Sequence, residues 1–541
     1  MHQHLARRTG ALLAVTALGA AGLVASPGAA TAAPVPGADP APTTAAAGWL
    51  AGQLEGGLLT YTSGGFETTD VGLSIDTALA LREVGGQDAA VTAVRDAVAA
   101  GLDGYISGDA FGDPGSTYSG AAGKALVLAT ATGGDPEAFG GTDLVARVES
   151  VTDDATGRTA DVSQYGDYAN TLGQSFAARG LAAAGSPEAA AATDFLLDQQ
   201  CEAGFFRQAF SDADAADQTC DGTDGAVPSV DATATAVLNL LARDDAADEA
   251  IADAVDRAAA WLASAQRPGG AFGADDQIET PNANSTGLAG WALGLAGNAE
   301  PAERAAAWLR AHQLTNVGAC TPFRAADVGA VAYDDGALAG ARKDGVTTGT
   351  EGQYLRATAQ ALPALQWAPD RGMYGVVEID RTRTVRAGKK VRVQFLDFGP
   401  GSKVCIALGK QRRLSDVGFT GLASVDLTMP RGTAKRTVTA TAEDGSTLRR
   451  TYQVLDATRL KVTAKKQRVA RGAVQVVKVR GLTAREPVRV LVAGRTVDTG
   501  QANAKGRFTA RFKAAGSGRT TVAVQGRFGN RKGTATYRVT R

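Results

Sequence analysis

Histidine, cysteine and methionine are scarce in this chain, whose 541 residues include three His, four Cys and three Met. His2 and His4 stand at the extreme N-terminus, which leaves His312 as the one histidine in the body of the chain, and no Cys-x-x-Cys pair is present. Zinc sites need three or four His, Cys or acidic ligands at suitable spacings. The sequence therefore predicts no metal site, and we expect no cofactor.

Long apolar runs are equally scarce. One stretch, residues 11–25, follows Arg7-Arg8 and precedes Ala30-Thr31-Ala32, which together are typical of a secretory signal peptide. The run is too short to span a bilayer. We therefore predict a signal peptide over residues 1–32, a disordered leader rich in Ala, Pro and Thr over 33–47, and no membrane span. The mature protein is then expected to be secreted, and either extracellular or associated with the cell wall without a covalent anchor.

The few cysteines favour disulfides, because an exported protein meets an oxidising environment. Four cysteines allow three pairings. Cys201 and Cys220 would close a short polar loop, and Cys320 would then pair with Cys405 and tie the helical region to the next part of the chain.

Net charge is also nearly absent, at −1, but this value hides a division. Residues 1–369 carry about 18 basic and 45 acidic side chains, and residues 370–541 about 37 and 11. The two halves could dock on each other, the basic half could bind an anionic cell-wall polymer, or the charges could simply be solvated. The basic clusters lack interleaved aromatic residues, so we do not expect nucleic-acid binding.

What is present is a recurring signature in the first two-thirds of the chain, a bulky residue and Leu followed by Gln four or five residues later. It is found at Trp49-Leu50…Gln53, Phe195-Leu196…Gln199, Trp261-Leu262…Gln266 and Trp308-Leu309…Gln313. Trp261 and Trp308 are 47 residues apart, and the other intervals fit about six units. Such units bury their apolar faces only by stacking on one another.

Each unit is predicted to contain two helices joined by a glycine-rich turn. The second helix begins on small polar residues, as at 229–233 and 284–286, and continues as an apolar segment such as 236–241. Ser, Asp and Asn are preferred at helix starts, and a helix that is apolar on all sides must be buried. Six such pairs predict a ring over residues 48–368, with the second helices inside and the signature helices outside.

Near residue 370 the pattern changes to alternation of apolar with basic or Thr residues, as in 391–395, 437–441 and 488–492. Alternation of this kind predicts half-buried strands. Two β modules fit, over 370–456 and 457–541.

The stretch 266–272, followed by 282–286, resembles the repeat of protein prenyltransferase β-subunits and squalene/oxidosqualene cyclases. The resemblance covers about residues 49–366 and implies an (α/α)6 toroid with a central cavity. The β modules resemble bacterial immunoglobulin-like domains, most clearly at 497–509. The expected fold is thus multidomain, an all-α (α/α)6 toroid followed by two all-β immunoglobulin-like sandwiches.

The chain departs from the catalytic patterns of the toroid enzymes. It has no Asp-x-Asp-Asp acid of the cyclases, no Asp, Cys and His set for zinc, and no Cys-Gly-Glu-Gln thioester. We therefore predict no catalytic residue and a binding or interaction protein whose basic β modules attach it to the envelope. The alternative is a terpene-cyclase-like or carbohydrate-active enzyme that uses cavity carboxylates such as Asp231 or Asp276.

In a closed ring the starts of the inner helices meet at one mouth of the cavity, where their free N–H groups favour a polar or anionic ligand. The ligand, which the sequence does not identify, is expected to contact Asp76, Tyr118, Tyr168, Asn170, Asp231, Asn284 and Ser285. The competing interpretation is that these residues only cap their helices. Similarly, Phe66, Phe205, Phe206 and Phe272 either flank the ligand or pack the turns.

Overall fold

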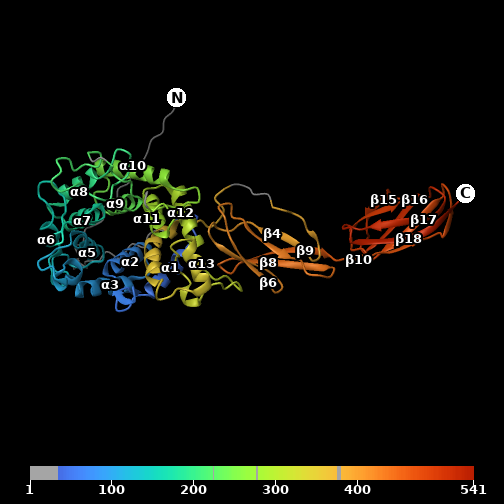
Figure 1. Cartoon of the computed structure of the whole chain (residues 1–541), viewed down its shortest axis with the longest axis horizontal. Helices are drawn as coiled ribbons and strands as arrows, with labels where there is room; N and C mark the ends of the chain where they lie inside the picture. The colour runs from blue at the N-terminus through green and yellow to red at the C-terminus, as the bar shows by residue number, and fades with distance from the viewer. Residues whose placement is uncertain (1–34, 223–224, 276–277, 375–378) are drawn as a thin grey trace, which may run out of the picture.

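The chain folds into three bodies that follow one another in a line, a helical domain and two β-rich units (Figure 1). The computed structural model describes residues 35–222, 225–275, 278–374 and 379–541. The predicted signal peptide lies outside the described residues. No helix among those described is long and apolar enough to cross a membrane.

Six helices form the inner wall of the helical domain. They are α2 (Val71–Val84), α5 (Ser119–Ala131), α7 (Thr171–Ala184), α9 (Val230–Leu241), α11 (Ala283–Leu295) and α14 (Glu351–Ala361). Each packs on the next in this order, and α14 packs on α2, so the ring is closed. The domain is therefore an α/α toroid, as the repeat pattern predicted.

Polar residues begin these inner helices, as the sequence indicated. Asp70, Asn170, Ser229 and Asn282 are the N-caps of α2, α7, α9 and α11, and their side chains accept hydrogen bonds from backbone N–H groups of the first turn. Such caps satisfy donors that a helix leaves free at its start.

The outer layer consists of one helix from each repeat, with one additional helix in the last. The six are α1 (Ala41–Ala51), α3 (Asp88–Ala100), α6 (Leu144–Glu149), α8 (Ala189–Asp198), α10 (Glu249–Ala265) and α12 (Ala299–His312), and the addition is α13 (Asp335–Asp344). Shorter elements connect the layers: β1 (Thr60–Ser63), β2 (Phe66–Thr69), α4 (Asp103–Ile106), and the 3₁₀ helices Asp109–Phe111, Ala325–Asp327 and Pro363–Trp367.

Glutamine side chains join neighbouring outer units. The Gln266 amide donates to the carbonyls of Gly270 (3.0 Å) and Pro301 (2.8 Å), and Gln313 donates to those of Gly329 (3.1 Å) and Pro42 (2.8 Å). In the Phe195 repeat, Gln200 has this role and not the predicted Gln199. In these three repeats the glutamine pins its own turn to the next outer helix, and Gln313 closes the ring onto α1, whereas Gln53 of the first repeat donates to the Trp49 carbonyl of its own helix.

The leader is one place where the prediction is wrong. Residues 33–47 were expected to be disordered, but α1 begins at Ala41. Pro42 is tolerated in the first turn because the N–H it lacks has no helical partner there. Ala46 and Ala47 are buried with Trp49 and Leu50, which ties the segment to the toroid core.

The first β unit has two sheets that share one core. The larger has the order β3 (Thr384–Arg386), β9 (Thr447–Leu455), β8 (Ala434–Thr441), β5 (Lys403–Leu408), β6 (Gln411–Asp416), and the smaller pairs β4 (Lys390–Phe395) with β7 (Ala423–Thr428).

The second β unit is also two-layered. One sheet has the order β10 (Thr458–Arg459), β18 (Arg531–Thr540), β17 (Gly518–Gln525), β14 (Pro487–Val492), β15 (Arg495–Gln501), and β12 (Arg468–Ala470) also pairs with β18. The other has the order β11 (Lys461–Ala464), β13 (Val474–Arg480), β16 (Arg507–Lys513).

The toroid is fastened to the first β unit by covalent and ionic contacts. Cys320 and Cys405 form a disulfide across the junction, and Cys201 pairs with Cys220 inside the toroid, so both predicted pairs are present. Arg310, which is 3% exposed, bonds Glu443 of the β unit at 2.6 Å and also pairs with Asp39. The junction is thus ionic, but its cation comes from the acidic half of the chain and its acid, Glu443, from the basic half.

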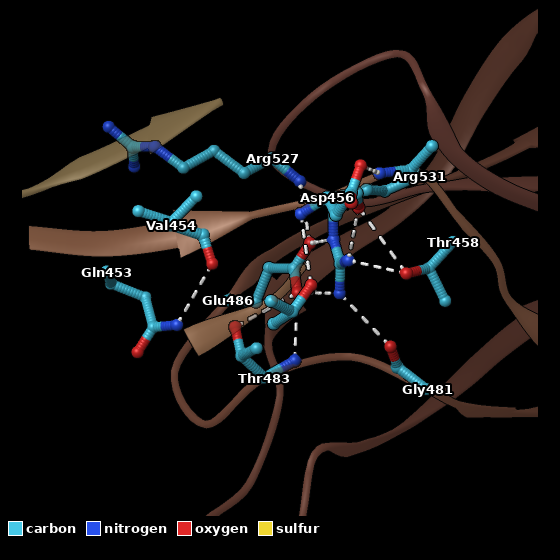
Figure 2. A network of polar contacts seen from close by, with 11 residues as sticks. Gln453, Val454, Asp456, Thr458, Gly481, Thr483, Glu486, Arg527 and Arg531 are labelled. Atoms are coloured by element: carbon cyan, nitrogen blue, oxygen red, sulfur yellow. Dashed lines mark hydrogen bonds and ion pairs between the residues drawn. The ribbon is translucent and has the colours of Figure 1, made fainter. Parts of the chain in front are cut away.

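A second buried arginine organises the link between the two β units. Figure 2 shows Arg531 held by both carboxylate oxygens of Glu486, at 2.6 and 2.9 Å. Its guanidinium also donates to the carbonyl of Asp456 (2.8 Å) and the hydroxyl of Thr458 (2.9 Å) on the linker. The linker is thus bonded to the second unit's interior.

Candidate functional site

A cavity of about 150 Å³ lies at the centre of the toroid, and all six inner helices contribute to its wall. Its lining consists of Asp76, Leu79, Ala80, Lys124, Leu172, Phe176, Arg179, Asp231, Thr235, Leu238, Asn239, Leu288, Trp291, Ala359 and Gln360. The prediction that the second helices face the cavity is therefore confirmed.

The lining follows helical geometry in layers. Five of the inner helices present their sixth residue, which is Asp76, Lys124, Phe176, Thr235 or Leu288. Positions 2 and 9–10 of several helices complete the wall above and below this layer, since residues three or four apart share a helix face. At 1.5 Å per residue the lining is about 10 Å deep.

A wider pocket of about 430 Å³ opens at the mouth, next to the start of α11 and α14. Its wall includes Tyr61 of the β1–β2 hairpin, Tyr333, Asn284 and Arg356. Asn284 and Arg356 each stand one helical turn before a cavity residue, Leu288 and Gln360, respectively. The mouth pocket and the cavity are thus consecutive along these two helices.

Asp231 occupies the second position of α9, with its side chain on the cavity wall. Burial raises the pKa of its carboxyl, the nearby Ser285 hydroxyl lowers it by less, and the charge of Asp275 raises it further. The first turn of a helix favours a negative charge, which opposes the effect of burial. Within the described part of the chain, Asp231 Oδ1 has no hydrogen-bond partner of good geometry.

Three more buried side-chain oxygens near the cavity are in the same condition. They are Asn284 Oδ1 at the mouth, Gln360 Oε1 on the cavity wall and Ser285 Oγ beside Asp231, and none finds a partner of good geometry among the described residues. Buried polar atoms are nearly always hydrogen-bonded, so each exception requires an explanation. Together with Asp231 they come from α9, α11 and α14, which are neighbours in the ring.

The opposite side of the cavity holds a matched ion pair. Lys124 Nζ lies 2.7 Å from Asp76 Oδ1, and the two side chains are 17% and 24% exposed. The same ammonium group is 5.5 Å from the centre of the Phe176 ring. Lys124 therefore neutralises Asp76 and also faces an aromatic ring, a favourable arrangement for a cation.

Arg179 is a second cation of the cavity, three residues beyond Phe176 on α7. Its guanidinium donates to Asn239 Oδ1 at 3.3 Å. Burial and the charge of Arg82 lower the pKa of Arg179 to about 10, so it is still charged at neutral pH. Burial also raises the pKa of neighbouring Glu83, which the charges of Arg82 and Arg179 oppose.

Exposed aromatic side chains gather on the segments that lead into the inner helices. Phe66 precedes α2, Phe111 precedes α5, and Tyr165 and Tyr168 precede α7, with exposures of 63–77%. The remaining turn aromatics Phe205, Phe206 and Phe272 are buried and pack the turns.

The structure separates the predicted site residues into two groups. Asp76 and Asp231 line the cavity, Asn284 lines the mouth, and Ser285 is fully buried beside Asp231. The others lie at the starts of α5 and α7: Tyr118 is the N-cap position of α5, Asn170 caps α7, and Tyr168 is 73% exposed. Asp276 lies outside the described residues.

The sequence pattern did not single out the residues deeper in the cavity. Lys124, Phe176, Arg179 and Gln360 belong to the lining, and none was predicted. Their spacing could have indicated them, because each lies on the same helix face as the first-turn residues, one or two turns further along.

In the described ranges, no group of three or more His, Cys, Asp or Glu is placed to hold a metal ion.

Comparison with known proteins found no matching family model and no matching curated protein. Several solved structures are similar to 60% of the chain. They include a protein from Actinoplanes (17% identity, 98% of that chain, TM-score 0.41) and the type II terpene cyclase MstE from Scytonema (16%, 96%, 0.41). An unsaturated glucuronyl hydrolase specific for heparin is similar over the same share (13%, 95% of that chain, 0.43). Such low values transfer no activity, and the toroid assignment depends on the helix contacts themselves.

Proposed function

We propose that the toroid binds a small neutral ligand with several hydroxyl groups, of the sugar or polyol class, without catalysing a reaction. The observation that carries the proposal is the convergence of three carboxyl and amide oxygens from adjacent inner helices, on Asp231, Asn284 and Gln360, that have no partner of good geometry among the described residues. A hydroxyl group donates to such oxygens and also accepts from cations such as Arg179. Phe176 and Trp291 offer apolar surfaces for the carbon side of a ring.

The charges and the size of the cavity favour this ligand class. Asp76 is neutralised by Lys124, and the lining contains one further acid, Asp231, and one further cation, Arg179, so acidic and basic side chains are equal in number and neither a strong anion nor a strong cation is preferred. A cavity of about 150 Å³ suits one six-membered ring and is too small for a long isoprenoid chain. The larger mouth pocket leaves room for a second ring or a chain, which Asn284, Tyr61 and Arg356 would meet.

The setting of the toroid is part of the same proposal. We infer that its helix pairs are repeats of the prenyltransferase and squalene cyclase type, and that the two β units are immunoglobulin-like. Both cysteine pairs form disulfides, which supports a secreted, extracellular protein. The excess of basic residues beyond 370 supports attachment to an anionic cell-wall polymer.

A thermal-shift and calorimetry panel tests the cavity proposal. Glucose, galactose, N-acetylglucosamine and myo-inositol are offered to the wild type, to Asp231→Leu and to Asp253→Asn, an exposed control on outer helix α10. At least one compound should bind the wild type and the control saturably, and Asp231→Leu should weaken that binding at least tenfold. Absence of binding by all four compounds, or equal binding by Asp231→Leu, would contradict the proposal.

A second function, acid catalysis on a sugar derivative, is favoured by one observation. The raised pKa of Asp231 lets its carboxyl keep a proton at a pH where an ordinary aspartate is ionised, as a general acid requires. Asp231→Asn separates the two ideas, because an amide keeps an acceptor oxygen but cannot supply a proton. Binding that survives this substitution while a glycoside-cleaving activity disappears would establish the enzyme; a wild type that binds without turnover would exclude it.

A further inference from the structure

The C-terminal β unit has an extreme charge. Residues 457–541 contain 21 Lys and Arg and two acidic residues, Glu486 and Asp498. Glu486 is fully buried in its pair with Arg531, so it contributes nothing to the surface. The first β unit is different, because its buried Lys403 pairs with Asp416 and its Glu443 holds the toroid's Arg310. Surface attraction for anions is therefore concentrated in the last 85 residues.

The cations of this unit are densest on one sheet, β11-β13-β16. Its inward residues, such as Val477, Val479 and Ala510, are buried in the core. Six of the residues that alternate with them are basic and exposed: Lys461, Lys478, Arg480, Arg507, Arg511 and Lys513. We call these six residues the cationic face.

The strand register places like charges directly opposite one another. Lys461 pairs with Arg480 across β11 and β13, and Arg480 pairs with Arg507 across β13 and β16. Like charges in such positions destabilise a sheet. No cation of the face forms an ion pair with any residue that the structure describes, and the one acid at its margin, Asp498, accepts a backbone hydrogen bond from Arg511. The protein thus retains an arrangement that folding alone does not favour, and the other sheet has one such row, Arg468, Arg538 and Arg519, at a lower density of basic residues.

The spacing of the face fits a particular kind of anion. Outward residues on one strand are about 6.7 Å apart, and neighbouring strands are about 4.8 Å apart. Three backbone bonds of an extended chain span about 3.3–3.8 Å. A three-carbon polyol phosphate has six bonds between successive phosphorus atoms, so its charges repeat about every 7 Å. This repeat is close to the distance of about 6.7 Å between successive outward residues of one strand.

The uncharged members of the face argue against nucleic acid. The other outward side chains are those of Thr463, Thr509, Val474 and Val476, and the aromatic rings of Phe508 and Phe512 belong to the core side. Proteins that hold single-stranded nucleic acids stack bases on aromatic side chains. This face offers charge without stacking, which suits a polymer that has phosphates and no bases.

We propose that the cationic face of β11-β13-β16 is the site where the protein binds a linear phosphodiester polymer of a short polyol. This inference rests on the envelope attachment proposed above and assigns it to one sheet of one unit. Each phosphate bridges cations of adjacent strands, such as Arg480 and Arg507, and binding releases the counterions of the polymer. The toroid remains free to bind its own ligand.

The test compares two triple variants of the mature full-length chain on immobilised poly(glycerol phosphate). The first is Lys461→Gln/Arg480→Gln/Arg507→Gln on the cationic face. The matched control is Arg468→Gln/Arg519→Gln/Arg538→Gln, three exposed arginines that form a similar row on the other sheet. Affinity is measured between 50 and 500 mM salt, and circular dichroism confirms that each variant is folded.

The wild type should bind with an affinity that falls steeply with salt. The face variant should bind at least tenfold more weakly at low salt, with a logarithmic salt slope smaller by about 2, since each lost phosphate contact removes about 0.7. The control variant should lose less than threefold. If the wild type does not bind the polymer at all, the envelope attachment itself fails. If it binds but the control variant loses as much as the face variant, attachment stands and the assignment to this face is overturned.

Two further probes address the chemistry of the polymer. Single-stranded DNA and poly-glutamate of equal charge should each bind at least tenfold more weakly than poly(glycerol phosphate) at 150 mM salt. Tighter binding of the DNA would identify a nucleic-acid surface. Equal binding of poly-glutamate would show that charge alone decides, and either result would overturn the phosphodiester assignment.

Discussion

Among the residues that the structure describes, the toroid and the C-terminal β unit both contain polar groups without protein partners, but in one these groups are enclosed and in the other they are exposed. In the toroid these groups are oxygens enclosed by helices, such as Asp231 Oδ1 and Gln360 Oε1. In the β unit they are exposed cations on an open sheet, such as Arg480 and Arg507. An enclosed site selects by shape and hydrogen bonding, whereas an open row of charges selects by long-range attraction that salt screens.

The molecule also contains buried arginines whose charges are fully paired. Arg310 joins the toroid to the first β unit, and Arg531 joins the linker to the second. The comparison therefore predicts a difference in the sign of the stability change: removing a partnered charge lowers the free energy of unfolding, whereas removing an unpartnered charge raises it. Four substitutions test this difference, in order of expected effect.

The largest effect is expected for Arg531→Met. It leaves the fully buried Glu486 without its counter-charge, and breaking such a pair costs about 3–5 kcal/mol. Calorimetric unfolding of the full chain measures the loss. Burial raises the pKa of Glu486, but hydrogen bonds from Arg531 and Thr483 outweigh it and hold the pKa below its usual range.

The pH dependence of this effect has a definite sign. Because the folded-state pKa of Glu486 is lowered, its stabilisation is complete above the ordinary glutamate pKa and is lost as the pH falls through the lowered value. The difference in the free energy of unfolding between the wild type and Arg531→Met should therefore become smaller in acid. A loss below about 1 kcal/mol at pH 7 would show that the pair does not hold the unit together.

Arg310→Met should have the second largest effect, a loss of about 2–3 kcal/mol, because Glu443 and Asp39 retain some contact with water. All five tryptophans lie in the toroid, so their fluorescence follows its unfolding in urea. The Cys320–Cys405 disulfide should keep the two bodies joined in this variant. An unchanged urea midpoint would show that Arg310 does not stabilise the junction and that the disulfide alone holds it.

Asp231→Asn should have the opposite effect on stability. It should stabilise the toroid by about 1–2 kcal/mol at pH 7, because it removes a buried charge without a full set of partners. The raised folded-state pKa makes the wild type lose stability as the pH rises from the ordinary aspartate pKa through the raised value. The gain should therefore vanish below about pH 3.9. A destabilised variant at pH 7 would mean that Asp231 has a structural partner and is not held for a ligand.

The smallest effect is expected for the face variant Lys461→Gln/Arg480→Gln/Arg507→Gln. Removal of three like charges in direct register should raise the free energy of unfolding by up to about 1 kcal/mol. The gain should shrink at high salt, which already screens the repulsion. Thermal unfolding at 20 and 500 mM salt measures both. A loss of stability would indicate that these side chains support the sheet.

Much of this organisation was predictable because it depends on local pattern. Helical spacing, capping residues such as Ser229, and strand alternation after residue 370 indicated the ring and the two β units. The basic excess after residue 370 was also visible in the sequence, but the cationic face was not, since the pairing of β11 with β13 depends on turns and core packing. The leader was misjudged because burial of Ala46 and Ala47 is decided by the toroid core.

The site was only half predictable for a similar reason. First-turn residues such as Asp231 and Asn284 are conspicuous because polar residues there interrupt an apolar pattern. Lys124 and Arg179 are isolated charges within Ala-rich helices, and only the closed ring shows that they face Asp76 and Asn239 from neighbouring helices. Tertiary proximity of this kind is not encoded in the spacing within one helix.

The most direct measurement is the affinity of the full chain for the neutral compound that binds best in the panel, at 50 and 500 mM salt, for the wild type and Asp231→Leu. We predict an affinity that changes less than twofold with salt and falls at least tenfold in the variant, because an enclosed hydrogen-bonded site is poorly screened. An affinity that drops with salt or survives in Asp231→Leu would contradict the assignment of ligand binding to the toroid cavity.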